Sequence, residues 1–385
     1  MFPARSPRSL TLIGGTLILL ALYIHIGFPL DRLPSTFSLA SSPRFGVGDV
    51  DGILPFPSKT YVIHLARRED RFEDMERLRT RLGLEWSYVP AEDSHSPLVR
   101  RIMNQVRTMR QEELLTLGKA YPPNTTIKLP FQWPAPDTPL PFDDWRLDAP
   151  PAPHPGLVPD DHLTCATEDF TISPYSPLIP EYKILSPSRL ACWHSHLSAI
   201  QRASTHMPKK AQAAALILED DIDIEANVKA RLLSVWSLLP ADWDIVFLGH
   251  CWSNESHYPA LGLAHFRFLK NAPTAPSTPQ THLHPSHRPL CTHAYALSAT
   301  GAHRLLLHLT HPPFAYSRAI DHALAWLVQS GRLKSFSVVP SVVAQRKIGE
   351  SDVMLGTTGS RWREGLVSGV LASEDEAAGS SSSEP

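Results

Sequence analysis

Five acidic side chains follow a short apolar run near the middle of the chain. The run covers residues 213–218, and the acids come directly behind it: Glu219, Asp220, Asp221, Asp223 and Glu225. Neighbouring carboxylates repel one another, so such a cluster is costly unless a cation or solvent compensates its charge. Mg²⁺ and Mn²⁺ prefer oxygen ligands and are often held by one or two carboxylates together with substrate phosphates. The pattern predicts a metal–diphosphate site or, equally, a solvated turn whose acids cap the next helix.

The direction in which these acids point depends on the apolar run being a strand. Short apolar runs that end in polar residues are typical of buried strands in α/β sheets, although a buried helix segment gives the same pattern. In a strand, Glu219, Asp221 and Asp223 point to one face and Asp220 to the other. Open α/β sheets bind ligands at the carboxyl ends of their parallel strands. The acids are therefore expected where such a sheet binds its ligand.

A basic group follows the first predicted strand, residues 59–65. Arg67, Arg68 and Arg71 come directly after this strand, with Asp70 among them. The guanidinium fork binds phosphate oxygens in pairs, so arginines at a strand end suit a nucleotide or its phosphates. A solvated basic helix start explains the same spacing.

Two histidines lie on a helix predicted at residues 187–203. His194 shares a helix face with Leu190 and Leu197, which indicates a hydrogen-bonded histidine of the core. His196 points away from that face and could reach the acids.

Strands and helices alternate along most of the chain. The expected strands, besides the two above, cover residues 86–89, 243–249, 292–298 and 335–339. The expected helices cover residues 72–82 (ended by Gly83), 97–117, 225–238, 301–309 and 320–328 (with Ser317 as a possible cap). This alternation predicts a Rossmann-like α/β/α sandwich, and a fold of this kind does not by itself name a reaction.

Proline-rich segments interrupt the pattern. Residues 121–159 contain twelve prolines and predict a long surface insertion, and residues 31–58 predict a stem or linker. A second loop, residues 270–289, carries His282, His284 and His287. Because no Cys or acidic partner is near, these predict a mobile lid or exposed segment rather than zinc. The acidic, serine-rich tail at 373–385 predicts disorder.

The N-terminus predicts entry into the secretory pathway. Arg5 and Arg8 precede a mostly apolar run at residues 10–30, about the length that spans a bilayer. Basic residues ahead of the run favour a cytoplasmic tail at 1–9 and a lumenal body, as in a single-pass type II protein of the Golgi or endoplasmic reticulum membrane. A cleaved signal peptide is the competing interpretation. The net charge of −2 excludes a global basic field for nucleic acid.

Four cysteines in an oxidising compartment allow up to two disulfides. Cys251 and Cys291 each flank a predicted strand, with a long loop between them, and are the preferred pair. Cys165 with Cys192 is a weaker expectation. Two glycosylation sequons, at Asn124 and Asn254, agree with a lumenal body.

Taken together, several segments resemble glycosyltransferase family 25, which contains lipooligosaccharide and procollagen galactosyltransferases. Residues 61–65 (YVIHL) with Arg67, Arg68, Asp70 and Arg71 resemble that family's opening strand and Arg-x-x-Asp-Arg element. Residues 190–196 (LACWHSH) are similar to its Gly-Cys-x-x-Ser-His helix, and 216–221 (LILEDD) to its Leu-Glu-Asp-Asp signature. Segments 244–249, 294–301 and 319–321 continue the order, so the resemblance covers residues 59–355. Ala191 in place of glycine and the two proline-rich insertions are departures.

The resemblance implies a GT-A fold, a UDP-sugar donor (most often UDP-galactose) and inversion at the anomeric carbon. Glu219 and Asp221 would hold Mn²⁺ (or Mg²⁺) against the diphosphate. The residues implied around the donor are Leu65, Arg67, Arg68, Asp70, Arg71, His196, Asp220 and Asp352. Asp352, after the last strand, would close over the donor or be a plain loop residue.

An acceptor hydroxyl must lose its proton as it attacks, so a base must lie within hydrogen-bond reach of it. Asp321 is the first candidate base and His250 the second. The expected function is an inverting, metal-dependent transfer of a sugar to a glycan or glycoprotein. A catalytically inactive lumenal or cell-surface binding protein of the same fold is the main alternative, and a metal-dependent phosphoesterase is another.

Overall fold

The computed structural model describes residues 58–119, 125–140, 162–207, 213–262, 280–346, 352–353 and 365–372, all within one structural unit, Asp49–Pro385. The predicted membrane segment at 10–30, the stem and the acidic tail lie outside the described residues. Among the residues that are described, no helix has the length and apolar character needed to cross a bilayer.

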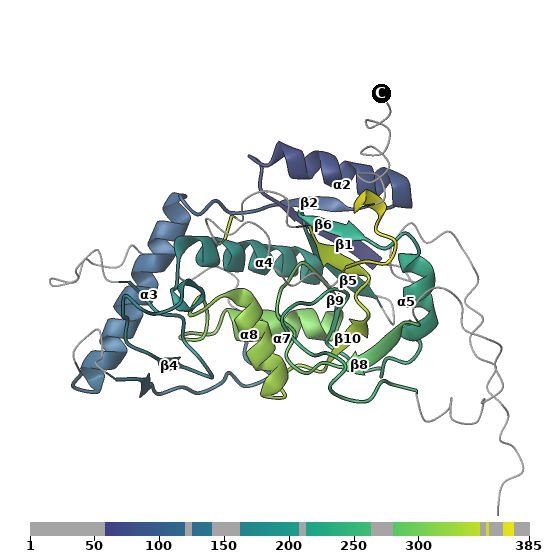
Figure 1. Cartoon of the computed structure of the whole chain (residues 1–385). Coiled ribbons are helices and arrows are strands. Elements are labelled where there is room, and N and C mark those ends of the chain that lie inside the picture. Colours follow the sequence, from purple (N-terminus) through teal and green to yellow (C-terminus); the bar gives the residue numbers. More distant parts are fainter. Residues whose placement is uncertain are drawn as a thin grey trace, which may run out of the picture. The chain divides into compact units, whose positions relative to one another are not determined.

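A seven-stranded mixed sheet forms the centre of the fold (Figure 1). Its strands, in spatial order, are β2 (Ser87–Pro90), β1 (Ser58–His64), β5 (Ala214–Glu219), β9 (Ala294–Ser298), β7 (Ile245–Phe247), β10 (Ser335–Val339) and β8 (His282–Pro285). β1 pairs in parallel with β2 and β5, and β7 with β10. β9 runs antiparallel between β5 and β7, and β8 runs antiparallel on β10. The sheet is mostly parallel and is compatible with the expected Rossmann-like class.

Helices cover both faces of this sheet, as side-chain alternation along its buried strands requires. On β5, Ile217 belongs to one core cluster while Leu216 and Leu218 belong to another. The first cluster includes residues of α3 (Pro97–Thr116), α4 (Pro187–His206), α7 (Ala299–Leu309) and α8 (Ile320–Gln329). The second includes residues of α2 (Glu69–Leu82) and α5 (Val228–Trp236). The α/β/α layering is therefore present.

Local signals set most helix ends. Gly83 ends α2 in the left-handed conformation, at φ 57°, which glycine adopts without steric cost. Ser96 and Ser186 cap α3 and α4, each followed by proline at the first helical position. The expected cap of α8 by Ser317 is wrong: Ala319 holds the cap position, and the Ser317 hydroxyl donates to the Phe314 carbonyl instead.

Parts of the proline-rich segments are more ordered than their composition indicates. Within the loop at 270–289, the described residues include β8, where Leu283 is fully buried, so a wholly exposed segment is the wrong interpretation there. In the insertion at 121–159, β3 (Ile127–Lys128) pairs with β4 (Thr171–Ile172), and Ile127 and Leu129 are buried in a small third core cluster. Tertiary pairing orders sequences that lack a local pattern of their own.

Candidate functional site

The predicted acidic strand ends where the parallel strands of the sheet have their carboxyl ends. Glu219 is the last residue of β5, and Asp220 and Asp221 form the turn into β6 (Ile222–Ile224). β6 pairs with β11 (Val343–Gln345), which brings a distant part of the chain against the turn. The start of β9 lies at the same edge because β9 runs opposite to β5. Acids, Gln345 and the residues before β9 therefore meet at one place.

Asp220 is buried and fully engaged with the end of β1. One of its oxygens accepts from the Leu65 backbone N–H at 3.1 Å and contacts His64 Nδ1 at 2.9 Å. Its other oxygen accepts from Arg71 at 3.0 Å. Arg71 also lies 3.5 Å from Asp221, so the two neighbouring acids share one arginine. Leu65 contributes its backbone amide to this network.

Glu219 is oriented by two side chains that both contact the same carboxylate oxygen. Thr292 donates its hydroxyl to Glu219 Oε1 at 2.7 Å, and His196 Nε2 lies 3.1 Å from that oxygen. The other ring nitrogen of His196 lies 3.0 Å from the Tyr295 hydroxyl. Burial works to raise the pKa of Glu219, but the hydrogen bonds from His196 and Thr292 outweigh it and lower the pKa to about 2. Glu219 is thus held ionised, with Oε2 outside both contacts.

Asp221 is the acid whose charge the protein compensates least. Gln345 donates to its Oδ2 at 2.9 Å, and Arg71 lies 3.5 Å from the same oxygen. Its Oδ1 is buried and accepts no hydrogen bond from any described residue. Burial, together with the charges of Glu219 and Asp220, raises the pKa of Asp221 to about 7. A buried carboxylate oxygen without a partner is costly, and a cation would remove that cost.

These two acids fit a divalent cation. Both are carboxylates, the ligands that Mg²⁺ and Mn²⁺ favour, and Asp221 Oδ1 is an acceptor without a donor. Within the described part of the chain, no group of three or more His, Cys, Asp or Glu side chains is arranged to hold a metal. A metal held here would need the phosphates of a substrate to complete its coordination, as is usual for Mg²⁺.

Three arginines converge beside the acids on one carboxylate. Asp352 accepts from Arg67 and Arg68 at 2.6 Å each and lies 3.1 Å from Arg71. Arg68 also makes two hydrogen bonds to Asp70, at 2.9 and 2.7 Å, and these lower the pKa of Asp70 to about 2. All three arginines predicted from the sequence therefore surround a single anionic group. We call Arg67, Arg68 and Arg71 the arginine cradle.

Asp321 and His250 are placed differently from one another. Asp321 lies in the first turn of α8, half-buried, and accepts from the backbone N–H of His322 at 2.8 Å. The charges of Glu219, Asp321 and Asp221 all raise the pKa of Cys192 on α4, after the dominant effect of burial, so all three acids lie near this thiol. His250, the residue before Cys251, is buried and only 4% exposed. Asp321 is therefore the more exposed of the two side chains.

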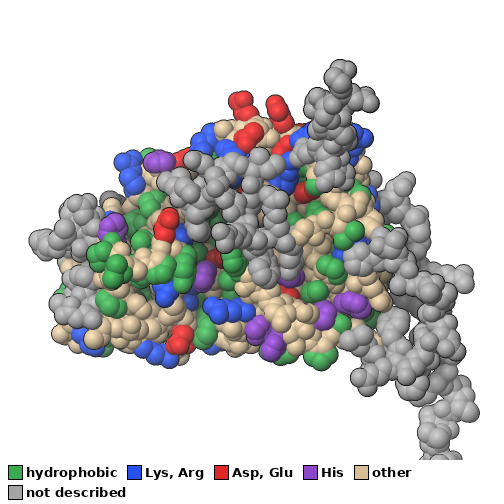
Figure 2. Space-filling model, in the orientation of Figure 1, with side chains coloured by type: hydrophobic (Ala, Val, Ile, Leu, Met, Phe, Trp, Pro, Cys, Tyr) green, Lys and Arg blue, Asp and Glu red, His purple; other side chains and the backbone are tan. Residues whose placement is uncertain are grey.

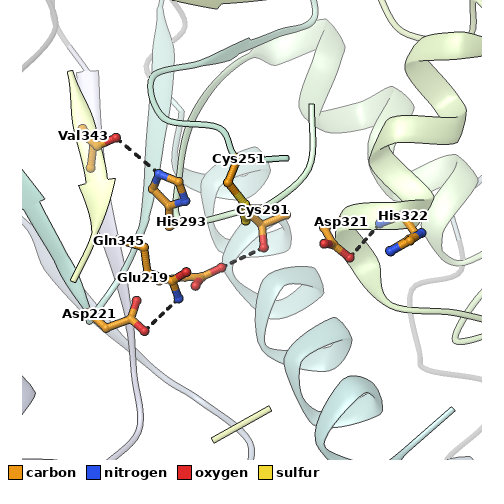
Figure 3. Close-up of a disulfide and its surroundings, with 10 residues drawn as sticks. Glu219, Asp221, Cys251, Cys291, His293, Asp321, His322, Val343 and Gln345 are labelled. Carbon is orange, nitrogen blue, oxygen red and sulfur yellow. Dashed lines mark hydrogen bonds between the residues drawn. A yellow bond between two sulfur atoms is a disulfide. The ribbon is translucent and has the colours of Figure 1, made fainter. Parts of the chain in front are cut away.

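The preferred disulfide, Cys251–Cys291, is present (Figure 3). In that view the disulfide lies between Glu219 and Asp321. Thr292 follows Cys291 directly in the sequence. The weaker expectation, Cys165 with Cys192, is wrong, since both are free thiols. The electrostatic surroundings of the two differ: Cys192 is near the acids, whereas Cys165 is near Arg189, Arg110 and Arg318.

Several residues of the site escaped the sequence analysis. Thr292, Tyr295 and Gln345 each contact a predicted site residue, and the backbone carbonyl of His293 accepts from Glu219 N–H at 2.9 Å. The sequence did place Thr292 at the start of a predicted strand. Because that strand, β9, runs antiparallel to β5, its start lies beside the end of β5. Nothing local marks Gln345. His194, expected in the core, is half-buried and lies 2.8 Å from the Tyr316 hydroxyl.

Surface charge on the face shown in Figure 2 is mixed. Lys and Arg side chains alternate with Asp and Glu along the edge that α2 occupies in Figure 1.

Comparison with known proteins finds no family model that matches the chain and no curated protein with detectable sequence similarity to it.

Proposed function

We propose that this protein is a metal-dependent glycosyltransferase that moves a sugar, galactose in the first instance, from a UDP-sugar to a hydroxyl of a glycan or glycoprotein. The observation that carries the proposal is Asp221: a half-buried carboxylate whose Oδ1 is buried and unpartnered among the described residues, close to Glu219 at the carboxyl end of a central strand. The mixed α/β sheet supports the GT-A fold that the family 25 resemblance implies. Inversion at the anomeric carbon is part of the proposal and rests on that resemblance alone.

Glu219 and Asp221 would hold Mn²⁺ (or Mg²⁺), and Thr292, His196 and Gln345 keep the two carboxylates in place. When bound, such an ion supplies Lewis-acid stabilisation of the charge that develops on a departing diphosphate. The arginine cradle would bind the nucleotide's phosphates, because guanidinium groups pair with phosphate oxygens at two points. Asp70, Asp220 and the Leu65 amide orient those arginines and the strand end that carries them.

Asp321 would accept the proton of the acceptor hydroxyl. It is half-buried, it is held by the His322 amide, and it lies near the same thiol as the two acids. His250 is the second choice, and its burial beside the disulfide makes direct contact with an acceptor harder. As a general base, Asp321 would take the proton of the acceptor hydroxyl in the transition state, as the oxygen attacks the sugar.

The proposed location is the lumen of the Golgi or endoplasmic reticulum, with a single-pass N-terminal anchor. Two features of the described residues support an oxidising compartment. The Cys251–Cys291 disulfide is one, since disulfides persist there. The exposed sequon residue Asn254 is the other.

A screen of UDP-sugars with the purified full-length protein tests the proposal. We expect Mn²⁺-dependent release of UDP from one donor, with UDP-galactose tried first, and loss of that release in Asp221→Asn. Release without a divalent ion, or equal release by the variant, would contradict the metal assignment.

One contact favours a non-catalytic binding protein of the same fold. Asp352 already occupies the arginine cradle, so the cradle of the described structure is satisfied internally. If that pairing is permanent, UDP and Mn²⁺ should leave the melting temperature unchanged. A rise in melting temperature that needs both ligands would favour the transferase, and hydrolysis of simple phosphate esters would instead indicate a phosphoesterase.

A further inference from the structure

The Cys251–Cys291 disulfide is linked to Glu219 through the two residues that follow Cys291. Thr292 follows Cys291 directly and donates to Glu219 Oε1 at 2.7 Å. The residue after it, His293, accepts the Glu219 backbone N–H through its carbonyl at 2.9 Å. The segment tied by the disulfide is therefore the segment that touches the proposed metal ligand through both side chain and backbone. Figure 3 shows the disulfide beside Glu219.

The backbone at this point needs support. Cys291 adopts a φ of 67°, a left-handed conformation that residues other than glycine rarely take. Such conformations persist only where surrounding contacts hold them. The disulfide and the hydrogen bond from the Cys251 N–H to the Leu290 carbonyl, 3.0 Å, are the contacts that span this turn.

The two tied segments also lie unusually close. Leu248 N–H donates to the Ala294 carbonyl at 3.0 Å, and Gly249 lies beside His293. A Cβ atom at Gly249 would lie 2.1 Å from His293 Nε2, so only glycine allows this approach. The two ends of the tied loop are also joined at a second place, because the buried carboxylate of Glu255 accepts from the backbone N–H groups of His287 and Arg288. Loss of the disulfide should therefore loosen the chain locally, around Thr292.

We propose that Thr292 is a positioning residue for the metal-binding carboxylate of Glu219, and that the Cys251–Cys291 disulfide holds Thr292 in place. This inference rests on the proposed function, since it assumes a divalent cation at Glu219 and Asp221. Thr292 and His196 both contact Oε1, which leaves Oε2 as the oxygen presented to a cation. The disulfide thus serves the site rather than stability alone.

The test measures equilibrium binding of Mn²⁺ to the full-length protein in the presence of UDP. Thr292→Val keeps the side-chain shape and removes the hydroxyl, and we expect Mn²⁺ affinity to fall about tenfold to a hundredfold, as is typical for lost outer-shell contacts to a metal ligand. Thr292→Ser retains the hydroxyl and should restore affinity to within about threefold of the wild type. Equal affinity in the valine variant would overturn the proposal.

A double-mutant cycle tests the role of the disulfide. We expect Cys251→Ala with Cys291→Ala to weaken Mn²⁺ binding as Thr292→Val does, and adding Thr292→Val to that pair to cost little more, because coupled residues act non-additively. Unchanged affinity without the disulfide, or losses that multiply, would show that the disulfide does not act through Thr292. If the cysteine variants fail to fold, the valine and serine pair still decides the role of Thr292.

The same measurement separates the two proposals. Wild-type protein that binds no Mn²⁺ contradicts the proposed function. Wild-type protein that binds Mn²⁺, with a valine variant that binds equally well, contradicts the role of Thr292 alone.

Discussion

Arg110 and Arg318 are more deeply buried than Glu219 and Asp221 at the end of β5, and both donate hydrogen bonds to backbone carbonyls within the protein. Arg110 donates to the carbonyls of Thr164 and Ser317 at 2.7 and 2.9 Å. Arg318 donates to the carbonyls of Glu168 and Asp169 and stacks on the Phe314 ring at 4.5 Å. Burial lowers the pKa of Arg318 to about 9, so this charge carries a cost that those contacts offset.

Asp221 carries a similar cost without that compensation. Its Oδ1 has no donor among the described residues, and its pKa is raised to about 7 chiefly by burial. Buried polar groups in native proteins are almost always paired, so an unpaired one calls for a reason. The arginines hold loops together, and the unpartnered oxygen of Asp221 supports the proposal that the acids bind a cation.

The largest difference expected between the acids and the buried arginines is in the turnover of sugar transfer. We predict that Asp221→Ala lowers the turnover of sugar transfer by at least about a thousandfold, since electrostatic stabilisation of the leaving diphosphate is lost. Folding should stay near normal, because the change removes a buried charge with an unpartnered oxygen. Steady-state kinetics and circular dichroism check this, with Glu73→Ala on the exposed side of α2 as the matched control. Retained Mn²⁺-dependent donor hydrolysis would reject the metal assignment.

Asp321→Asn should lower turnover by about a hundredfold to ten-thousandfold, the range for loss of a general base. Donor affinity should be kept, because Asp321 is assigned to the acceptor side. Turnover and UDP binding measured on the same preparation check both statements. Near wild-type turnover would remove Asp321 as the base and would return attention to His250.

The pH dependence of stability tests the buried acid directly. The pKa of Asp221 is raised from 3.8 to about 7 in the folded state, so folding favours its protonated form. That contribution is fully present below about pH 4 and is lost as the pH rises through about 7. Without divalent ions, wild type should therefore lose up to about 4 kcal/mol relative to Asp221→Asn between these pH values, at 1.36 kcal/mol per pKa unit.

Urea denaturation of both proteins across this pH range, in the presence of a chelator, provides the measurement. The comparison between the two proteins cancels other titrating groups, including His308, whose pKa burial lowers to about 4. If the unfolding free energies of the two proteins ran parallel with pH, the protein itself would compensate the charge of Asp221.

A change at the buried Arg318 should affect stability and leave metal binding unchanged. Arg318→Met removes the donors of several buried carbonyls, and each buried polar group left unpaired costs about 1–3 kcal/mol. We predict a loss of roughly 3 kcal/mol in the free energy of unfolding, with Mn²⁺ affinity unchanged. Urea denaturation checks it, and Arg101→Met, on the exposed side of α3, is the control. A variant that folds normally but binds Mn²⁺ weakly would break the comparison.

Local patterns predicted most of the fold. The last expected strand, residues 335–339, coincides with β10, and α4 begins at the predicted proline, Pro187. β8 was missed because its sequence, HLHP, has one apolar residue and a proline, and its order comes from pairing with β10. Edge strands of this kind depend on a partner that a local pattern does not reveal.

The candidate site was predictable in part, for a related reason. The acids and arginines stand at strand ends, which their spacing marks. The partners that decide the state of each acid come from far along the chain: Thr292 is 73 positions from Glu219, and Gln345 is 124 positions from Asp221. Which carboxylate oxygen is left unpartnered follows from those contacts, and from the antiparallel direction of β9, rather than from any nearby residue.

Equilibrium binding of Mn²⁺ in the presence of UDP to wild type, Asp221→Asn and Glu73→Gln tests the central claim most directly. Wild type and Glu73→Gln should bind one Mn²⁺ per chain with equal affinity, and Asp221→Asn should lose that binding. Equal binding by all three proteins, or none by the wild type, would contradict a divalent cation at the end of β5.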